Sequence, residues 1–238
     1  MRLHYAPGSA HSASVRIALA EKGLEAELHK LNLVAHEQHR SEFVALNRHG
    51  TVPVLEDGGH ALLETFLILE YLEDTHPQPS LIGKDPRQRY LARKWGKYVE
   101  THIAPNLAIV RWAALHGRVP EGAVADLAGL HAARCALWLR ARQGFGQEQL
   151  AASTQAMLAA AGRVAADLAG REWLAGDRFT LADIAVYPHV AQFTALGLAV
   201  PGEVAAWLTR VAERPSVQAI KADLFPVATM GPELGRWG

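Results

Sequence analysis

The stretch YAPGSAHSASVR, residues 5–16, places small polar side chains between a short apolar segment and an amphipathic one. A turn that ends a strand and opens a helix leaves several backbone N–H groups unpaired, backed by the positive end of the helix dipole. An anion is stabilised at such a turn. One fitting anion is a thiolate, because a hydroxyl hydrogen bond and the dipole together lower a thiol pKa from its ordinary value near ~8.5.

Four side chains in this turn could hold the anion, and their spacing separates them. Ser12 and Ser14 lie closest to the expected helix body, so they are the better helix caps. Ser9 directly follows the Pro–Gly turn, farther from the helix, and its hydroxyl is better placed to face a ligand. We therefore predict Ser9 as the anion partner, with His11 and Ser12 as alternatives.

Two further segments carry groups that suit a peptide-like ligand. In NRHGTVPVLEDG, Pro53 lacks an N–H group, so it marks a strand edge or a bend. A cis Val52–Pro53 bond would turn the Val52 backbone outward, where an extended peptide pairs with it. Glu64 and Thr65 begin the next helix, where they either cap it or receive the ammonium and carboxylate of an amino-acid head group.

Composition excludes several function classes. The chain has 238 residues, half of them apolar, with 24 basic and 24 acidic side chains, which does not favour nucleic acid or an anionic membrane as a partner. The twelve histidines are scattered without a metal-ligand spacing. There is neither a signal-like N-terminus nor an apolar run near ~18 residues, so we expect a cytoplasmic protein. The one cysteine, Cys135, is expected to be a small buried apolar residue.

The first third of the chain alternates strand-like and helical segments. Strands are predicted at 2–5, 26–33, 52–57 and 60–64, and helices at 14–23, 41–47 and 65–76. A tight turn at 57–59 separates the last two strands, and Pro77 ends the last of these helices. A strand–helix–strand unit followed by a hairpin predicts a mixed sheet with helices on its faces.

The pattern then changes to helices alone. HPQPSLIGKDP, residues 76–86, carries three prolines and a glycine and is typical of a linker. Helices are predicted at 89–103, 124–141, 153–169, 181–193, 203–213 and 216–223, and residues 224–238 are expected to pack as a tail. The chain is thus divided into an α/β domain over 1–77, a linker over 78–86 and an all-α domain over 87–238.

In this order and spacing the motifs resemble the cytosolic glutathione S-transferase superfamily, of a serine-type, bacterial-like kind. The N-terminal match is YxPxSxxSxxVRIALxEKGL, then EFxxLNxxGxVPVLEDGxxxLxET and ILEYLE. The C-terminal match is WLAGDRFTLADIAVYP and RPSVQAI. The resemblance implies a thioredoxin-like N-terminal domain, an all-α C-terminal domain and a homodimer. It also implies glutathione bound beside a pocket for a small hydrophobic electrophile, and no metal.

The resemblance assigns roles to the residues already singled out. Ser9 matches the serine that hydrogen-bonds the glutathione thiolate. Val52 and Pro53 match the cis-proline element that pairs with the cysteinyl backbone. Glu64 and Thr65 match the Glu–Ser pair that binds the γ-glutamyl head.

Other matches are looser. Thr51 falls where many members carry Gln or Lys, and His39 and Arg40 resemble a His–Lys pair near the glycyl carboxylate, across a one-residue gap. His11 falls roughly where cysteine-bearing members keep the cysteine, so mixed-disulfide chemistry is disfavoured. Tyr5 competes with Ser9, because some classes use an N-terminal tyrosine.

Four residues of the helical domain complete the set. His102 lies on the apolar stripe of the 89–103 helix and resembles a histidine that faces the sulfur in some members, although such a position usually serves packing. Trp112 is a candidate wall of the electrophile pocket. Thr180 and Asp183 in FTLAD match the family's capping box, which is structural.

The function implied is a glutathione transferase in which Ser9 holds the thiolate for nucleophilic attack. A glutathione-dependent isomerase, dehalogenase or etherase on the same site is the first alternative. A non-catalytic binding protein of the same fold is the second, and the retention of Ser9, Val52-Pro53 and Glu64-Thr65 argues against it.

Overall fold

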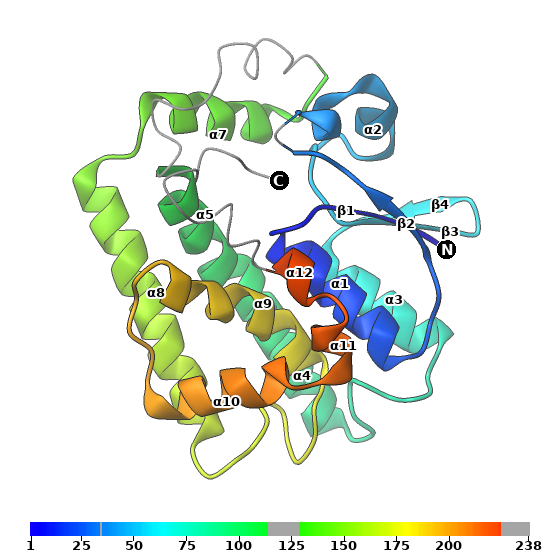
Figure 1. Ribbon diagram of the computed structural model, residues 1–238, viewed down its shortest axis with the longest axis vertical. Coiled ribbons are helices and arrows are strands. Elements are labelled where there is room, and N and C mark those ends of the chain that lie inside the picture. The colour runs from blue at the N-terminus through cyan, green and yellow to red at the C-terminus, as the bar shows by residue number, and fades with distance from the viewer. Residues whose placement is uncertain (34, 114–128, 225–238) are drawn as a thin grey trace.

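The computed structural model describes residues 1–33, 35–113 and 129–224. Its first part contains the four strands and the flanking helices that the sequence predicts (Figure 1). In chain order these are β1 (Arg2–Tyr5), α1 (Ala10–Glu21), β2 (Glu27–Lys30), the short turn η1 (Glu37–His39), α2 (Ser41–Leu46), β3 (Val54–Asp57), β4 (His60–Leu62) and α3 (Thr65–Thr75).

The sheet is mixed, with strand order β2-β1-β3-β4. β1 and β2 are parallel, with Arg2 opposite Glu27, because α1 provides the crossover between them. β3 runs antiparallel to β1, with Leu55 opposite Leu3, and it forms a hairpin with β4. Gly58 supplies the positive φ of 55° that the hairpin turn requires. The predicted mixed α/β fold class is confirmed.

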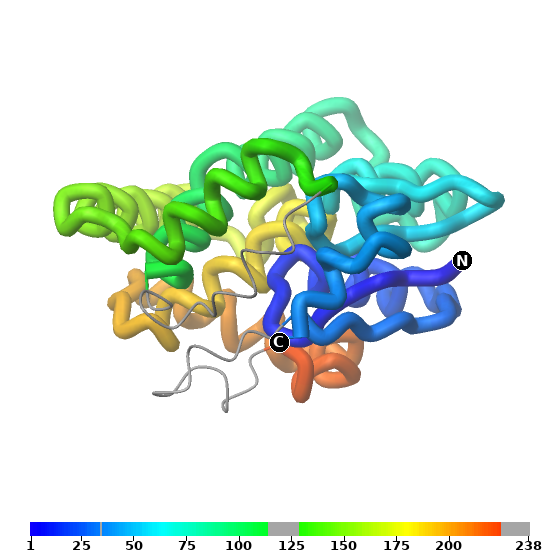
Figure 2. The backbone as a smooth tube through the Cα atoms, turned by 90° about the horizontal axis from the view of Figure 1, so that it is seen from above, coloured from blue at the N-terminus to red at the C-terminus, as the bar shows by residue number. Residues whose placement is uncertain are grey.

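The second part is helical, as predicted, and packs beside the sheet domain (Figure 2). Its elements are α4 (Pro86–Tyr98), the π-helical turn η2 (Val99–Ile103), α5 (Ala104–Ala113), α7 (Ala132–Gln143), α8 (Gln147–Leu168), α9 (Leu181–Ala195), α10 (Gly202–Ala212), α11 (Pro215–Gln218) and α12 (Lys221–Leu224).

Several predicted boundaries were wrong. The 89–103 helix contains the π-helical turn η2 and continues as α5. The described part of the 124–141 helix begins only at Ala132, because Gly129 turns at φ 93° and the His131 side chain caps the new start. The 216–223 segment forms two short helices rather than one, and the tail prediction falls almost wholly on residues outside those described.

The prediction that Cys135 is a buried residue was also wrong. Its side chain is only partly buried, and its Sγ lies 3.8 Å from the Leu130 carbonyl oxygen, as a weak donor. The residue lies on α7, one turn from the start of that helix.

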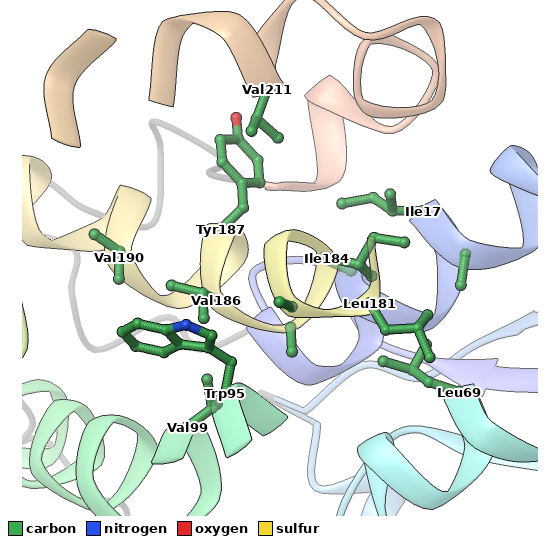
Figure 3. Close-up of a cluster of buried hydrophobic side chains, with 14 of the residues drawn as sticks. Ile17, Leu69, Trp95, Val99, Leu181, Ile184, Val186, Tyr187, Val190 and Val211 are labelled. Carbon is green, nitrogen blue, oxygen red and sulfur yellow. The ribbon is translucent and has the colours of Figure 1, made fainter. Parts of the chain in front are cut away.

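The core is organised around α9, which is apolar on every side and therefore buried. Figure 3 shows α9 between Ile17 of α1 and Leu69 of α3 on one side and Trp95 and Val99 on another. Val211 of α10 lies beside Tyr187 in the same view. Because α1 and α3 belong to the sheet domain and α4 and α10 to the helical one, a single core joins the two domains.

The predicted capping box at the start of α9 is confirmed. The Thr180 side chain accepts a hydrogen bond from the Ala182 N–H, and Asp183 Oδ2 accepts from the Thr180 N–H at 3.0 Å. Asp183 Oδ1 also accepts from the Leu174 N–H at 3.1 Å and from Trp207 Nε1 at 2.9 Å. Burial raises the pKa of Asp183 to about 6, so the carboxylate is still mostly ionised at pH 7.

Replacing Asp183 by Ala should therefore destabilise the whole molecule. The change leaves the buried donors of Leu174, Thr180 and Trp207 without an acceptor, at roughly 1–3 kcal/mol each. We expect urea denaturation to report a loss of about 3 kcal/mol or more in the free energy of unfolding. Asp177→Ala, at an exposed position in the same loop, is the control and should change it by less than about 0.5 kcal/mol. Equal effects of the two substitutions would contradict the structural role of Asp183.

Candidate active site

The first helix begins earlier than the sequence predicts, and this reassigns the serines. Gly8, at φ 74°, ends the turn, and Ser9 is the N-cap of α1, its Oγ accepting from the Ser12 N–H at 3.2 Å. Ser12 and Ser14 lie inside the helix and are buried, so their predicted capping roles were wrong. All three are good caps, and the positive φ of Gly8 decides which of them is used.

Ser9 nevertheless keeps the chemical capacity that the sequence indicates. Its oxygen is held by the bond from the Ser12 N–H, and the hydroxyl hydrogen remains to be donated. Ser9 lines a cavity at the N-terminus of α1, together with Ala10 and His11, whose backbone N–H groups belong to the first helical turn. The arrangement suits a ligand anion that accepts a hydrogen bond from Ser9.

Ser14 has a different role, at the contact between the domains. Its hydroxyl lies 3.2 Å from the Ala10 carbonyl oxygen of its own helix and 3.0 Å from the Ile184 carbonyl oxygen of α9. Within α9 the Ile184 carbonyl has no N–H four residues later, because that residue is Pro188. Ser14 thus supplies the hydrogen bond that the proline removes.

The cavity has a volume of about 250 Å3 and lies between the two domains. It is lined by Gly8, Ser9, Ala10, His11, Leu33, Gln38, Gly50, Thr51 and Val52 from the sheet domain, and by Ala104, Leu107, Ala108, Arg111, Trp112, Arg134, Trp138 and His189 from the helical domain. Among these described lining residues there is no acidic side chain, whereas Arg111 and Arg134 are cationic. The cavity is therefore apolar with a positive charge.

Two histidines meet at the wall of the cavity. The His11 ring lies 4.7 Å from the His189 ring, edge to face, and its Nδ1 lies 3.0 Å from Thr65 Oγ1. Burial, with the nearby charge of Arg111, lowers the pKa of His11 to about 4. Burial also lowers the pKa of His189 well below its ordinary value, and its Nδ1–H donates to the Ala185 carbonyl oxygen at 2.9 Å. Both rings are therefore neutral at pH 7.

Two of the predicted peptide-binding residues line the same cavity and Thr65 lies against its wall, whereas Glu64 is not part of the described lining. Thr51 and Val52 line it, and the Val52–Pro53 bond, whose isomer the sequence left open, is cis. Thr65 contacts His11. Glu64 is exposed at φ 65°, in the N-cap position of α3, and among the described residues its carboxylate caps no N–H group. The capping alternative for Glu64 was therefore wrong.

The structure gives the pair predicted for the glycyl end, His39 and Arg40, contacts within the protein. His39 is buried with its ring 5.3 Å from the Trp138 ring, and the exposed Arg40 lies 3.3 Å from Glu37 as an ion pair. Neither belongs to the described lining of the cavity, whereas their neighbour Gln38 does.

Tyr5 and His102 are also absent from the described cavity lining. Tyr5 is buried, with the Arg16 guanidinium 4.6 Å from its ring centre. His102 is exposed and stacks on Tyr98 at 4.6 Å, because the π-helical turn η2 changes the register of the predicted stripe. Trp112, by contrast, lies in the cavity wall as predicted.

Besides Gln38 and the small or aliphatic residues of the wall, sequence reasoning missed the lining side chains of Arg111, Arg134, Trp138 and His189. Arg111 donates from Nη1 to the Gly8 carbonyl oxygen at 3.2 Å, beside Ser9. Arg134 and Trp138 are four residues apart on α7, a spacing that places them on one helix face. The spacing was visible in the sequence, but the direction of that face was not.

The described residues contain no group of three His, Cys, Asp or Glu side chains placed to hold a metal ion. Among the same residues, no helix has both the length and the apolar character needed to cross a lipid bilayer.

A thioredoxin-like sheet and an all-helical domain that share one cavity at a helix N-terminus define a glutathione-transferase-like protein. The chain matches the glutathione S-transferase N-terminal domain over residues 3–80 and the C-terminal domain over 128–215. It is 30% identical over 226 residues to glutathione S-transferase 2 of Saccharomyces cerevisiae, covering 92% of this chain and 89% of that protein. The chain belongs to the glutathione S-transferase superfamily, as the motifs indicated.

Other relatives in this superfamily carry names of other reactions. Protein LigF of Sphingobium sp. is 29% identical over 236 residues, covering 90% of both chains. The crystal structure titled beta-etherase LigF superposes with a TM-score of 0.84 at 27% identity, covering 93% of this chain and 99% of that one. Maleylacetoacetate isomerase of Rattus norvegicus is 34% identical over 128 residues, 52% of this chain and 59% of that protein.

The low pKa of His11 predicts a specific pH dependence of stability. An unfolded histidine titrates near ~6.5, whereas folded His11 titrates at about 4, so the unfolded chain binds more protons between these values. The contribution is fully present above pH 6.5 and is lost as the pH falls toward 4. His11→Gln should therefore lose less stability than the wild type between pH 7 and pH 5, by roughly 1–2 kcal/mol in urea denaturation.

The matched control is His102→Gln, which changes an exposed histidine on the same protein. Its loss of stability over this pH range should equal that of the wild type. The same loss in His11→Gln as in the wild type would show that His11 ionises normally.

Proposed function

We propose that this protein is a glutathione-dependent enzyme in which Ser9 holds the thiolate of glutathione. The observation that carries the proposal is the Ser9 hydroxyl, oriented by the Ser12 N–H and lining a positively charged cavity at the start of α1. Helix N-termini stabilise anions, and a hydroxyl donor adds a directed bond. Membership of the superfamily supports glutathione as the bound thiol.

Glutathione would lie along the sheet-domain side of the cavity. We assign the γ-glutamyl head to Glu64 and Thr65 at the start of α3, and the cysteinyl backbone to Val52. Thr51 and Gln38 also line the cavity, and we assign them to the glycyl end. Gln38 takes the place that the sequence assigned to His39 and Arg40.

The chemistry follows from the charges around Ser9. The thiol gives its proton to solvent, and the thiolate attacks the electrophilic carbon, so an S–C bond forms while the leaving group departs with its electron pair. Arg111 contributes positive charge beside Ser9 through its bond to the Gly8 carbonyl. Burial lowers the pKa of Arg111 only to about 10, so it is charged at neutral pH.

Conjugation to a small electrophile is the reaction that we propose first. Ether cleavage is the second candidate, favoured by the similarity to the protein titled beta-etherase LigF over nearly the whole chain. Both begin with the same attack by sulfur, and they differ in the group that leaves. The presence of Ser9, Val52 and Thr65 around one cavity counts against a purely non-catalytic protein.

The test is the ionisation of bound glutathione. In the wild type, ultraviolet absorbance of the thiolate, titrated with pH, should show a pKa about one to two units below that of an ordinary thiol near ~8.5. Ser9→Ala should raise the pKa of the bound thiol by about one unit, which corresponds to ~1.4 kcal/mol. An unchanged titration in Ser9→Ala would remove Ser9 as the thiolate partner.

Glu64→Ala separates binding from ionisation. Its retention on immobilised glutathione should fall, because the head-group ammonium loses its carboxylate, while the pKa of the thiol that still binds stays at the wild-type value. Retention equal to that of the wild type would contradict the assigned head-group site.

We also propose that the protein acts as a cytoplasmic homodimer through the face formed by α3 and α4. These helices approach closely, since the Phe66 ring covers Gly96, and the face exposes Leu67 by 60% and Tyr90 by 63%. Sedimentation should show a dimer that Leu67→Asp converts to monomer. Leu139→Asp, at an exposed leucine of α7, should leave the dimer intact. A wild-type monomer would overturn this arrangement.

A further inference from the structure

The α7 side of the cavity holds a cationic group, Arg134, for which the described residues supply no counter-charge. The Arg134 guanidinium carbon lies 5.2 Å from the Trp112 ring centre and 5.8 Å from that of Trp138. Among the described residues no charged group interacts with Arg134, and none accepts a hydrogen bond from its buried Nε. Burial of an unpaired charge is costly, so the position calls for a ligand anion.

Trp138 adds a second unmet donor to the same place. Its side chain is 7% exposed, and its Nε1–H is buried with no acceptor among the described residues. Trp138 follows Arg134 by four residues on α7, so both side chains lie on the helix face that lines the cavity. Buried donors without an acceptor are rare in native proteins.

The surroundings favour an anion over any other polar ligand. The other titratable groups of the described cavity wall are Arg111, which is cationic, and His11 and His189, which are neutral at pH 7. Burial lowers the pKa of Arg134 only to about 10, so it keeps its charge there. A guanidinium and a neighbouring N–H group together match the two oxygens of a carboxylate.

We propose that Arg134 and Trp138 bind a carboxylate carried by the second substrate. The electrophile is then an apolar molecule with an anionic group, which narrows the class of small hydrophobic electrophile that the sequence indicates. Its apolar body would lie against Leu107, Ala108 and Trp112, which line the wall beside this pair. The proposal rests on the proposed function, because it assigns the second substrate of the same reaction.

The position of Arg134 and Trp138 favours the second substrate, rather than glutathione, as their ligand. The residues assigned to glutathione, such as Thr51, Val52 and Thr65, belong to the sheet domain. Arg134 and Trp138 belong to α7 of the helical domain, and the Arg134 guanidinium stacks on Trp112 of α5. The cation nearer Ser9 is Arg111, which contacts Gly8.

Calorimetric binding of two product-like conjugates tests this assignment. S-(carboxynitrophenyl)glutathione and S-(carbamoylnitrophenyl)glutathione differ only in a carboxylate against a neutral amide. The wild type should bind the carboxylate form about tenfold more tightly or better, as expected for a charge-assisted contact in a buried site. Arg134→Gln should abolish this preference while changing the affinity for glutathione alone by less than about twofold. Trp138→Phe, which removes the N–H donor together with part of the indole ring but keeps an aromatic side chain, should reduce the preference several-fold.

Arg140→Gln is the matched control, because Arg140 is an exposed arginine on the same helix whose contacts are Gln149 and Phe145. It should keep the wild-type preference. Two results would overturn the proposal: no carboxylate preference in the wild type, or an equal loss of affinity for glutathione alone in Arg134→Gln. The latter would assign Arg134 to a carboxylate of glutathione itself.

A wild type that binds neither glutathione nor its conjugates would defeat the proposed function, and a second measurement then decides this inference. Binding of a free chloronitrobenzoate is compared with that of the matching chloronitrobenzamide, without glutathione. A preference for the acid that is lost in Arg134→Gln supports the anion site. No preference in the wild type refutes it.

Discussion

The contact between α1 and α9 is the constraint on which the cavity depends. Pro188 removes a helical hydrogen bond from the Ile184 carbonyl, and the buried Ser14 hydroxyl restores it at 3.0 Å. Because an unsatisfied buried carbonyl is costly, this hydrogen bond favours one relative position of α1 and α9. Ser9 caps the start of α1, and His189 belongs to α9. The relative position of the two helices therefore determines where both residues line the cavity. Ser14 thus helps to position Ser9, which lies at the start of the same helix and lines the cavity.

Burial then decides which groups in the cavity are charged. His11 and His189 become neutral, whereas Arg111 and Arg134 keep their charges because their pKa values start far above neutral. A cavity with cations and no acidic wall residue among those described attracts anions. A thiolate at Ser9 and a carboxylate at Arg134 both meet this requirement.

The sequence predictions were accurate for features that depend on residues close together in the chain, and less accurate for the others. The β3–β4 hairpin and the α9 capping box depend on neighbouring residues, and both were predicted correctly. The start of α1 was not, because three serines can each cap a helix and the φ of Gly8 decides among them. His102 was misplaced for a related reason, since a π-helical turn rotates it away from the expected stripe.

By itself, the sequence determined the mixed sheet, the helical second domain and the superfamily, because local motifs and hydrophobic periods encode these features. It also indicated that Ser9, Thr51, Val52 and Trp112 lie around one site. Only the tertiary structure decided that Gln38 rather than His39 lines the cavity, and that Arg111, Arg134 and His189 come together from three helices. Helical spacing tells which residues share a face. The direction of that face is set by packing between segments far apart in the chain, which a local pattern does not contain.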